Sequence, residues 1–216
     1  LSLHDALPIS DRLTLGNFVN TVTITNVETV TGAANADTVV AATALTAGTF
    51  DLAGGNDRLV LADFVNTVTV ANAETLTGGS TNDTVVLSAQ SKGSTIDLGG
   101  GNDRLTLGAF VNTVTVANIE TIVGGSTSDT VVLSGAQTGG TIDLAGGADK
   151  LVLAAAGATV TVTNTETIVG GTATDVIAFA GAVSATTIDL GAGSDKLTFT
   201  NAANTATVSN VETIVG

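Results

Sequence analysis

The chain lacks several of the residue types that carry most protein chemistry. Its 216 residues contain no Cys, Met, Trp or Tyr, and only one His and one Pro. The absence of Cys excludes disulfides and thiolate metal sites, although it does not fix the cellular compartment. No apolar run approaches the roughly 18 residues that a membrane-spanning helix needs. Because there is no Met, we expect that the first residue is not a natural start.

Positive charge is also scarce. Six Lys and Arg stand against 20 Asp and Glu, which gives a net charge of −14 and a pI near 4.1. Such a field repels phosphate backbones and anionic membrane surfaces and attracts cations. We therefore expect cations as partners, and neither nucleic acid nor membrane insertion.

An internal repeat organises nearly the whole chain. The block DLAGGNDRL at Asp51 recurs as DLGGGNDRL, DLAGGADKL and DLGAGSDKL, each 46 residues after the last, at Asp97, Asp143 and Asp189. The block AETLTGGSTNDTVV, which begins at Ala73, repeats with the same spacing. We expect residues 10–216 to form one continuous solenoid of about 4.5 repeats, truncated within a repeat at both ends.

The first ten residues, LSLHDALPIS, match no copy of the repeat. They hold both the only His (His4) and the only Pro (Pro8). They closely resemble one reading frame of a common sequencing-adapter oligonucleotide. We interpret residues 1–9 as an assembly artefact, to be left out of fold reasoning like a cloning scar, with a natural capping segment as the alternative.

Each 46-residue unit reads as short strands separated by Gly, Asn and Asp turns. The strands alternate with period two and are rich in Val, Ile and Thr. In one unit the candidate strands are 95–98, 104–107, 113–123 and 130–134. Four strands favour two coils of about 23 residues per repeat, because stacked coils bury apolar faces that one coil cannot. The fold class expected is all-β, a right-handed parallel β-roll or β-solenoid of about nine coils.

The period-two pattern also predicts which side chains point into the stack. In the same unit they are Ile96, Leu98, Leu105, Leu107, Val114 and Val116. The inward parity flips at Ala117–Asn118, which leaves open whether 113–123 is one strand or two. Asn-x-Glu-Thr recurs in every copy, and for its Asn we favour a left-handed turn position with stacked side chains over a ligand role.

The acidic residues mark four fixed positions of the repeat. Eighteen of the 20 lie there, and only Asp5 and Asp63 do not. The neighbouring Ser, Ala and Thr positions vary between copies, so the fixed carboxylates beside Gly turns call for a physical reason. The four sets are Asp11/57/103/149/195, Glu28/74/120/166/212, Asp37/83/129/175 and Asp51/97/143/189.

These positions resemble the RTX, or haemolysin-type, calcium-binding repeat GGxGxDxUx, in which U is a large apolar residue. In ETIVGGSTSDTVV (120–132) the GG falls on Gly124–Gly125, and Ile122 and Val131 fall on U. The resemblance implies a β-roll whose stacked turns bind Ca²⁺ through Asp carboxylates and loop carbonyls. Ca²⁺ takes six to eight oxygen ligands, and Gly lets a loop turn its carbonyls toward an ion.

The resemblance therefore implies a set of candidate calcium-binding residues. They are Asp57, Asp83, Asp103, Asp129, Asp149, Asp175, Asp195, Glu74, Glu120, Glu166, Gly55, Gly78, Gly79, Gly101, Gly124, Gly125, Gly147, Gly170, Gly171 and Gly193. No loop carries the full consensus, because the fourth position of the GG loops is Asn, Thr or Ala. Ion-free turns capped by Asp side chains are the alternative.

Three functions from different classes fit this sequence. The first is a calcium-binding structural or adhesive segment of a secreted bacterial surface protein, such as a surface-layer protein or adhesin. The family resemblance implies export by a type I system to the cell surface, with neighbouring copies or cell-surface glycans as candidate partners. The second is a metal-free solenoid adhesin of the autotransporter-passenger kind.

The third function is the repeat region of a larger secreted enzyme or toxin. Catalysis within this chain is not expected, because no copy of the repeat carries a unique set of residues and residues 10–216 contain no His, Cys or Tyr. We also considered ice binding by the recurring Thr-x-Thr pairs. These pairs equally suit exposed strand positions.

Overall fold

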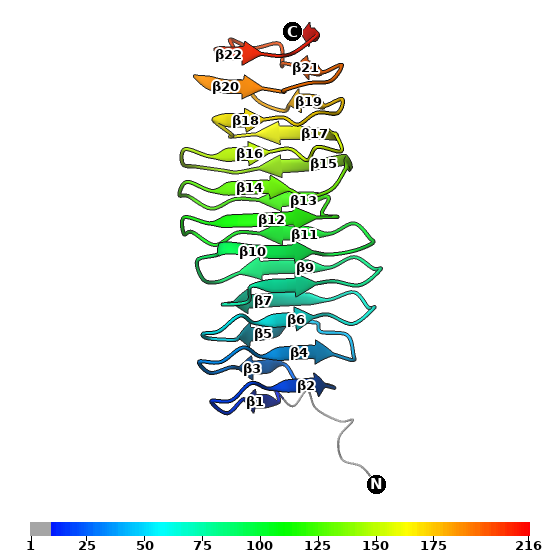
Figure 1. Ribbon diagram of the computed structural model, residues 1–216, viewed down its shortest axis with the longest axis vertical. Helices are drawn as coiled ribbons and strands as arrows, with labels where there is room; N and C mark the ends of the chain where they lie inside the picture. Colours follow the sequence, from blue (N-terminus) through cyan, green and yellow to red (C-terminus); the bar gives the residue numbers. More distant parts are fainter. Residues whose placement is uncertain (1–9) are drawn as a thin grey trace.

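A computed structural model describes residues 10–216 of the chain, which form 23 short strands and no helix (Figure 1). Strands of successive coils pair in parallel, and each coil contributes one strand to each of two sheets. The 12-stranded sheet contains β1 (Arg12–Thr14), β3 (Thr29–Thr31), β5 (Gly48–Asp51), β7 (Thr67–Ala71), β9 (Thr84–Leu87), β11 (Arg104–Thr106), β13 (Thr121–Val123), β15 (Gln137–Asp143), β17 (Ala158–Thr163), β19 (Val176–Phe179), β21 (Lys196–Thr198) and β23 (Thr213–Val215).

The second sheet has 11 strands and faces the first across the core. It contains β2 (Thr21–Ile24), β4 (Thr38–Ala41), β6 (Arg58–Val60), β8 (Thr75–Thr77), β10 (Lys92–Asp97), β12 (Thr113–Ala117), β14 (Thr130–Leu133), β16 (Lys150–Val152), β18 (Thr167–Val169), β20 (Thr186–Asp189) and β22 (Ala206–Ser209). The expected all-β parallel solenoid is confirmed.

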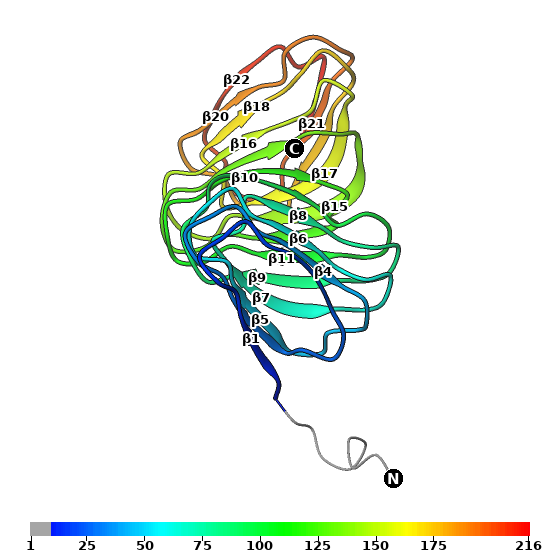
Figure 2. The same cartoon turned by 60° about the horizontal axis from the view of Figure 1, so that its bottom comes forward.

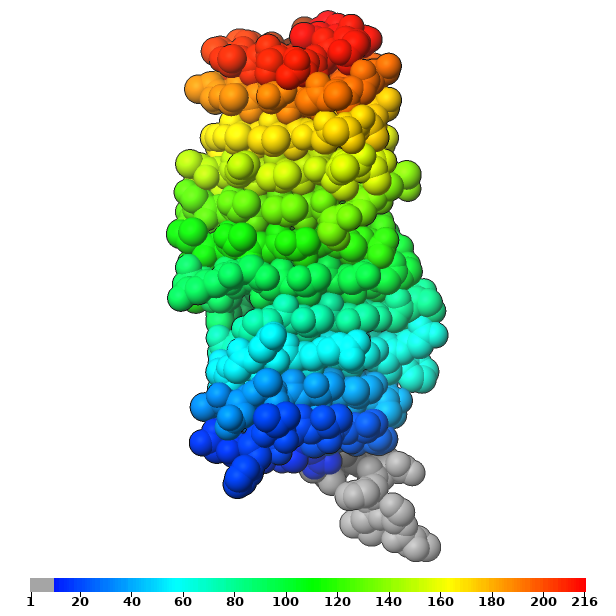
Figure 3. Space-filling model, viewed as in Figure 1, coloured from blue at the N-terminus to red at the C-terminus, as the bar shows by residue number. Residues whose placement is uncertain are grey.

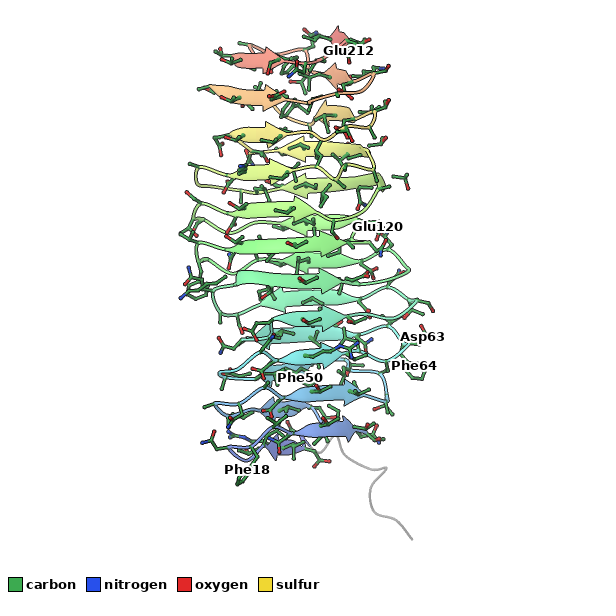
Figure 4. The ribbon with its side chains drawn as sticks, viewed as in Figure 1. Phe18, Phe50, Asp63, Phe64, Glu120 and Glu212 are labelled. Carbon is green, nitrogen blue, oxygen red and sulfur yellow. The ribbon has the colours of Figure 1, made fainter. Side chains whose placement is uncertain are left out.

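The core fills the space between the two sheets. The six side chains predicted to point inward are buried, each at most 3% exposed: Ile96, Leu98, Leu105, Leu107, Val114 and Val116. Phe50 is fully buried inside the stack (Figure 4). Val, Ile and Leu alternate with Thr along each strand, so the branched side chains pack inward while Thr faces outward or lies half-buried.

The structure decides the number of strands per repeat, which the sequence left open between four and five. Asn118 has a φ of 53°, and this left-handed residue ends β12 and turns the chain into β13, so 113–123 is two strands. Five strands therefore occupy each 46-residue unit. Paired residues on successive coils lie 17 to 21 positions apart, as in Thr113↔Thr130 and Lys92↔Thr113, so the expected two coils of about 23 residues are wrong.

An odd number of strands has a geometric consequence. Equivalent strands of successive repeats fall in opposite sheets, as β2 and β7 do, and return to the same sheet only in the next repeat, at β12. The same surface therefore recurs every second repeat, for example from Thr21 to Thr113. The two edges of the stack each receive alternate copies of every loop.

The coils stack into a rod of nearly constant width (Figure 3). Each coil is a flattened loop, as is visible when the bottom of the stack comes forward (Figure 2). With 12 strands in one sheet and a spacing of ~4.8 Å per strand, the rod is roughly 50 Å tall. It has more and shorter coils than the nine expected.

Two expectations lie partly outside this description. The interpretation of residues 1–9 as an assembly artefact concerns residues outside the described part of the chain. Within the described part, no helix is long and apolar enough to cross a membrane.

The left-handed turn at Asn118 should be essential to the five-strand unit. We predict that Asn118→Val lowers the free energy of unfolding by about 1–3 kcal/mol, because a β-branched residue is strained at positive φ. Asn118→Gly should cost no more than about 1 kcal/mol, the value of one lost side-chain hydrogen bond. Urea denaturation midpoints of the two variants test this, and equal losses would contradict it.

Candidate functional site

Side-chain acceptors stand immediately before the strands, at the two edges of the stack. In one repeat Asn112 precedes β12, Glu120 precedes β13, Asp129 precedes β14 and Asp149 precedes β16. Glu120 and Glu212 both lie on the edge where the chain enters the 12-stranded sheet (Figure 4). We call this series of Asn, Asp and Glu side chains the carboxylate ladder.

Each member of the carboxylate ladder accepts a backbone N–H from the preceding coil. The Asn66 amide N–H donates to Asp83 Oδ1 at 3.0 Å, and the Asp83 N–H donates to Asp103 Oδ1 at 2.6 Å. The Asp103 N–H in turn donates to Glu120 Oε2 at 2.8 Å. The side chain of Asn66 also accepts the Leu45 N–H at 3.0 Å. Five successive coils are thus joined by one column of hydrogen bonds.

The same column recurs along both edges. The further Asp-to-Asp and Asp-to-Glu pairs are Asp37–Asp57, Asp129–Asp149, Asp175–Asp195, Asp11–Glu28, Asp57–Glu74, Asp149–Glu166 and Asp195–Glu212. At each edge of the stack the chain turns from one sheet into the other, and the backbone N–H groups there have no strand carbonyl to bond to. When such a group is buried, it needs an acceptor from elsewhere in the protein. This requirement explains why the acidic positions stay fixed while their neighbours vary.

The two kinds of Asp in the ladder differ at their second oxygen. In Asp83, Asp129 and Asp175, Oδ2 accepts an N–H from the glycine four residues earlier, as Gly125 donates to Asp129 at 3.0 Å. The second oxygen is buried, with no hydrogen-bond partner among the described residues, in Asp37, Asp57, Asp103, Asp149 and Asp195. Only the first kind is saturated by protein donors.

Burial of these carboxyls changes their acidity. Burial raises the pKa of Asp57, Asp103 and Asp149 to about 6, partly offset by the backbone N–H that each Oδ1 accepts. The neighbouring ladder carboxylates add a smaller rise to each pKa, as Asp83 and Glu120 do for Asp103. Burial therefore favours the protonated form of these three carboxyls over the charged form.

The glycines predicted to bind calcium have a steric role. A Cβ on Gly124 would lie 2.3 Å from the Leu144 carbonyl oxygen of the next coil. Gly101 has a φ of 136°, and a Cβ there would lie 2.7 Å from the Thr81 backbone. Equivalent close approaches, each under 3.0 Å, occur at Gly55, Gly78, Gly79, Gly125, Gly147, Gly170, Gly171 and Gly193. Close coil stacking thus accounts for glycine at all of these positions.

The fourth acidic set caps its own turn. Asp97 Oδ1 accepts the Gly99 N–H at 3.1 Å and the Asn118 Nδ2 group at 2.7 Å. The recurring Asn residues have φ between 49° and 53°, so the predicted left-handed conformation is confirmed. Their side chains bond to Asp, not to one another as we expected, in Asn72, Asn118, Asn164 and Asn210.

Asp63 is the only described acidic residue outside the four sets. Its Oδ1 accepts the backbone N–H of Ser80 at 2.6 Å and also the Ser80 hydroxyl, and these hydrogen bonds lower its pKa. It caps a loop of the next coil from the edge that also carries Glu120 (Figure 4). Its departure from the repeat is therefore a local turn contact.

Some of the ladder residues fit a calcium ion and others do not. The donor set is all oxygen, which Ca²⁺ prefers, and Asp57, Asp103, Asp149 and Asp195 each offer one buried oxygen that receives no N–H. Both oxygens of Asp83, Asp129 and Asp175 already accept N–H groups. Glu74, Glu120 and Glu166 each accept one N–H group, through Oε2. Among residues 10–216 no three acidic side chains gather around one point, so backbone carbonyls would supply most ligands.

No protein-family model, curated protein or solved structure matches the chain. The likeness to RTX repeats therefore rests on the motif residues alone. The sequence predicted the acidic positions, but not the role of the Asn residues that precede them in the columns, such as Asn66 and Asn112. In one copy Ala158 takes the place of this Asn. The signal was present, because Asn66 and Asn112 both stand 17 residues before an Asp, the spacing of one coil.

The raised pKa values predict that the fold is more stable in mild acid. Between the usual Asp pKa near 3.9 and about 6, the folded chain binds more protons than the unfolded chain. The resulting stability is fully present below the lower value and is lost as the pH rises through about 6. In chelator, the urea midpoint should therefore fall from pH 5 to pH 7.5.

The matched control replaces the three carboxyls whose pKa rises to about 6, as Asp57→Asn, Asp103→Asn and Asp149→Asn together. This variant should show a flatter pH profile over the same window, because its amides do not titrate. A midpoint that rises with pH in the unmodified chain, or an unchanged slope in the variant, would contradict the assignment.

Proposed function

We propose that residues 10–216 are a calcium-binding structural and adhesive repeat segment of a secreted bacterial surface protein. The observation that carries the proposal is the set of buried Asp oxygens without a donor at Asp37, Asp57, Asp103, Asp149 and Asp195. We further propose that the coils wind in a right-handed β-roll, because nearly all parallel crossovers have that hand. Export to the cell surface belongs to the same proposal.

The ladder residues explain how such a segment would respond to calcium. Asp103 and its equivalents hold negative charge in a buried column, next to the carboxylates of the coils on either side. This charge opposes stacking unless it is neutralised. A bound Ca²⁺ would supply positive charge and accept the free Asp oxygens as ligands. Since only the stacked chain brings these groups together, calcium would favour the folded state by mass action.

This response suits a protein that is exported. Extracellular calcium modules bind with dissociation constants of about 0.1–1 mM, far above the free calcium inside a cell. The acidic chain would remain loose during export and become rigid outside. Its net charge of −14 favours cations as binding partners. The same charge disfavours nucleic acid as a partner and insertion into a membrane.

A scaffold role is favoured over catalysis within the described part of the chain. The ladder repeats from coil to coil along both edges with the same hydrogen bonds. An active site is normally one place that combines distinct groups, and residues 10–216 lack His, Cys and Tyr. A rod of stacked coils instead presents extended surfaces and transmits load along its length.

A metal-free solenoid adhesin is the second candidate. It is favoured by the N–H groups that the ladder already accepts, which saturate Asp83, Asp129 and Asp175 completely. In that case protons, not calcium ions, would relieve the buried charge of Asp57, Asp103 and Asp149.

Calcium titration of the 216-residue chain distinguishes the two candidates. Chelator-treated protein should gain β-structure or thermal stability as Ca²⁺ rises from micromolar to millimolar, followed by far-UV circular dichroism. Replacing Asp57, Asp103, Asp149 and Asp195 together with Asn should abolish the gain. The matched variant with Asn at positions 83, 129 and 175 should keep it. A chain that is already folded in chelator, with no thermal shift on adding Ca²⁺, would overturn the calcium proposal.

A further inference from the structure

One segment varies between copies more than any other, and it lies between the fourth and fifth strands of each repeat. It reads ATALTAG at 42–48, SAQSKGS at 88–94, SGAQTGG at 134–140 and AGAVSAT at 180–186. Each copy has a buried side chain at its fourth position: Leu45, Ser91, Gln137 or Val183. The four positions are equivalent, because each lies 46 residues after the last.

The backbone N–H at this position makes the same hydrogen bond in each copy whose next coil carries an Asn at the facing place. The N–H groups of Leu45, Ser91 and Val183 donate to the side-chain oxygens of Asn66, Asn112 and Asn204, at 3.0 to 3.1 Å. The copies therefore differ mainly in how much space the side chain fills. Ser91 is the smallest of the four.

Pockets open beside Ser91 and beside Val183. At Ser91 the pocket measures about 270 Å³, and at Val183 about 160 Å³. Leu45 fills the corresponding place in the first repeat. In the third, Gln137 spans it and donates from Nε2 to the Ile119 carbonyl at 3.2 Å and the Gly139 carbonyl at 2.9 Å.

The open copies share one edge of the rod. Ser91 and Val183 lie where the chain passes from the 12-stranded into the 11-stranded sheet, before β10 and β20. Leu45 and Gln137 lie on the opposite edge, because each repeat contains an odd number of strands. Five strand spacings of ~4.8 Å put the two pockets about 24 Å apart along the rod.

The larger pocket has an apolar floor and walls that accept hydrogen bonds. Val70 and Leu87 form the floor. The Ser91 hydroxyl donates to the Thr113 carbonyl at 3.0 Å and accepts the Ser94 N–H at 3.3 Å, which leaves it one lone pair. The Ser94 hydroxyl donates to the Ala73 carbonyl at 2.8 Å, so it too can act toward a ligand only as an acceptor. The Glu74 carboxylate lines the same pocket and uses Oε2 for the ladder, which leaves Oε1 as an acceptor.

The smaller pocket repeats this chemistry. Glu166 lines it and, like Glu74, accepts a ladder N–H through Oε2. The Thr165 hydroxyl donates to the Thr163 carbonyl at 3.2 Å, so it too presents lone pairs. Val183 occupies part of the volume that Ser91 leaves open.

We propose that the Ser91 pocket binds a single sugar residue, with the Val183 pocket as a smaller second site on the same edge. Several hydroxyl donors on one small ring match the acceptors of Ser91, Ser94 and Glu74, and the ring's C–H face matches Val70 and Leu87. A volume of about 270 Å³ is just below the range of pockets for drug-sized ligands, so it suits one ring and not a longer ligand. The assignment rests on the adhesive part of the proposed function and is independent of calcium.

The chain itself supplies the substitutions that test this site. Ser91→Leu and Ser91→Gln place in the second repeat the side chains found at Leu45 and Gln137. Neither changes the carboxylate ladder, and filling a cavity should keep or raise the unfolding temperature. Ser88→Gln is the matched control, since Ser88 is exposed and is not among the residues that line the pocket.

Methyl glycosides of glucose, galactose, mannose and N-acetylglucosamine are the probes. They would be titrated into the 216-residue chain in Ca²⁺ and in chelator, with amide chemical shifts as the readout. We expect at least one to bind with a millimolar dissociation constant and to shift the amides of Ser91, Lys92 and Ser94. Ser91→Leu and Ser91→Gln should each weaken binding at least tenfold, and Ser88→Gln should not.

The proposal is overturned if none of the four probes shifts these amides, or if the filled variants bind as well as the unmodified chain. Circular dichroism of each variant shows whether it is folded under the conditions of the titration. Loss of the calcium effect with sugar binding intact would overturn only the calcium proposal. A calcium effect that persists when no probe binds would overturn only the sugar site.

Discussion

The structure depends on one interaction: a side-chain oxygen at each corner accepts a backbone N–H of the preceding coil. Parallel sheets satisfy the backbone within the strands, but every coil must turn twice, and the N–H groups at those turns have no strand partner. Asp83 and Asp103 show the solution, because each accepts from the coil before and donates to the coil after. The resulting column joins coils at the places where the sheets cannot.

This interaction places negatively charged carboxylates in the buried edges of the stack. A carboxylate offers two oxygens, and at Asp57, Asp103 and Asp149 only one has a protein donor. Burial of these three carboxyls raises their pKa to about 6. The same acid that completes the backbone hydrogen bonds therefore makes the stability of the stack depend on pH and, under our proposal, on calcium. Stability and a response to the surroundings arise from the same side chains.

Much of the fold could be predicted from the sequence, because period-two alternation and a fixed 46-residue spacing report directly on strands and stacking. The strand count could not, since one left-handed residue at Asn118 divides a continuous Val-Thr run. The acidic positions of the site were also predictable. Their partners were not, because the 17- and 20-residue offsets that bring Asp83 to Asp103 depend on the coil length. The pocket at Ser91 appears only when side-chain volumes are compared at equivalent places.

Native-state hydrogen exchange at the corner amides tests the role of the carboxylate ladder most directly. The amides of Asp83, Asp103 and Asp129 lie outside the strands, yet their acceptors are side chains of the next coil. We predict that they exchange only on global unfolding, as slowly as amides within β12 and β14. Exchange as fast as at exposed turn residues such as Ser126 would contradict the account, because the ladder would then not hold the coils together.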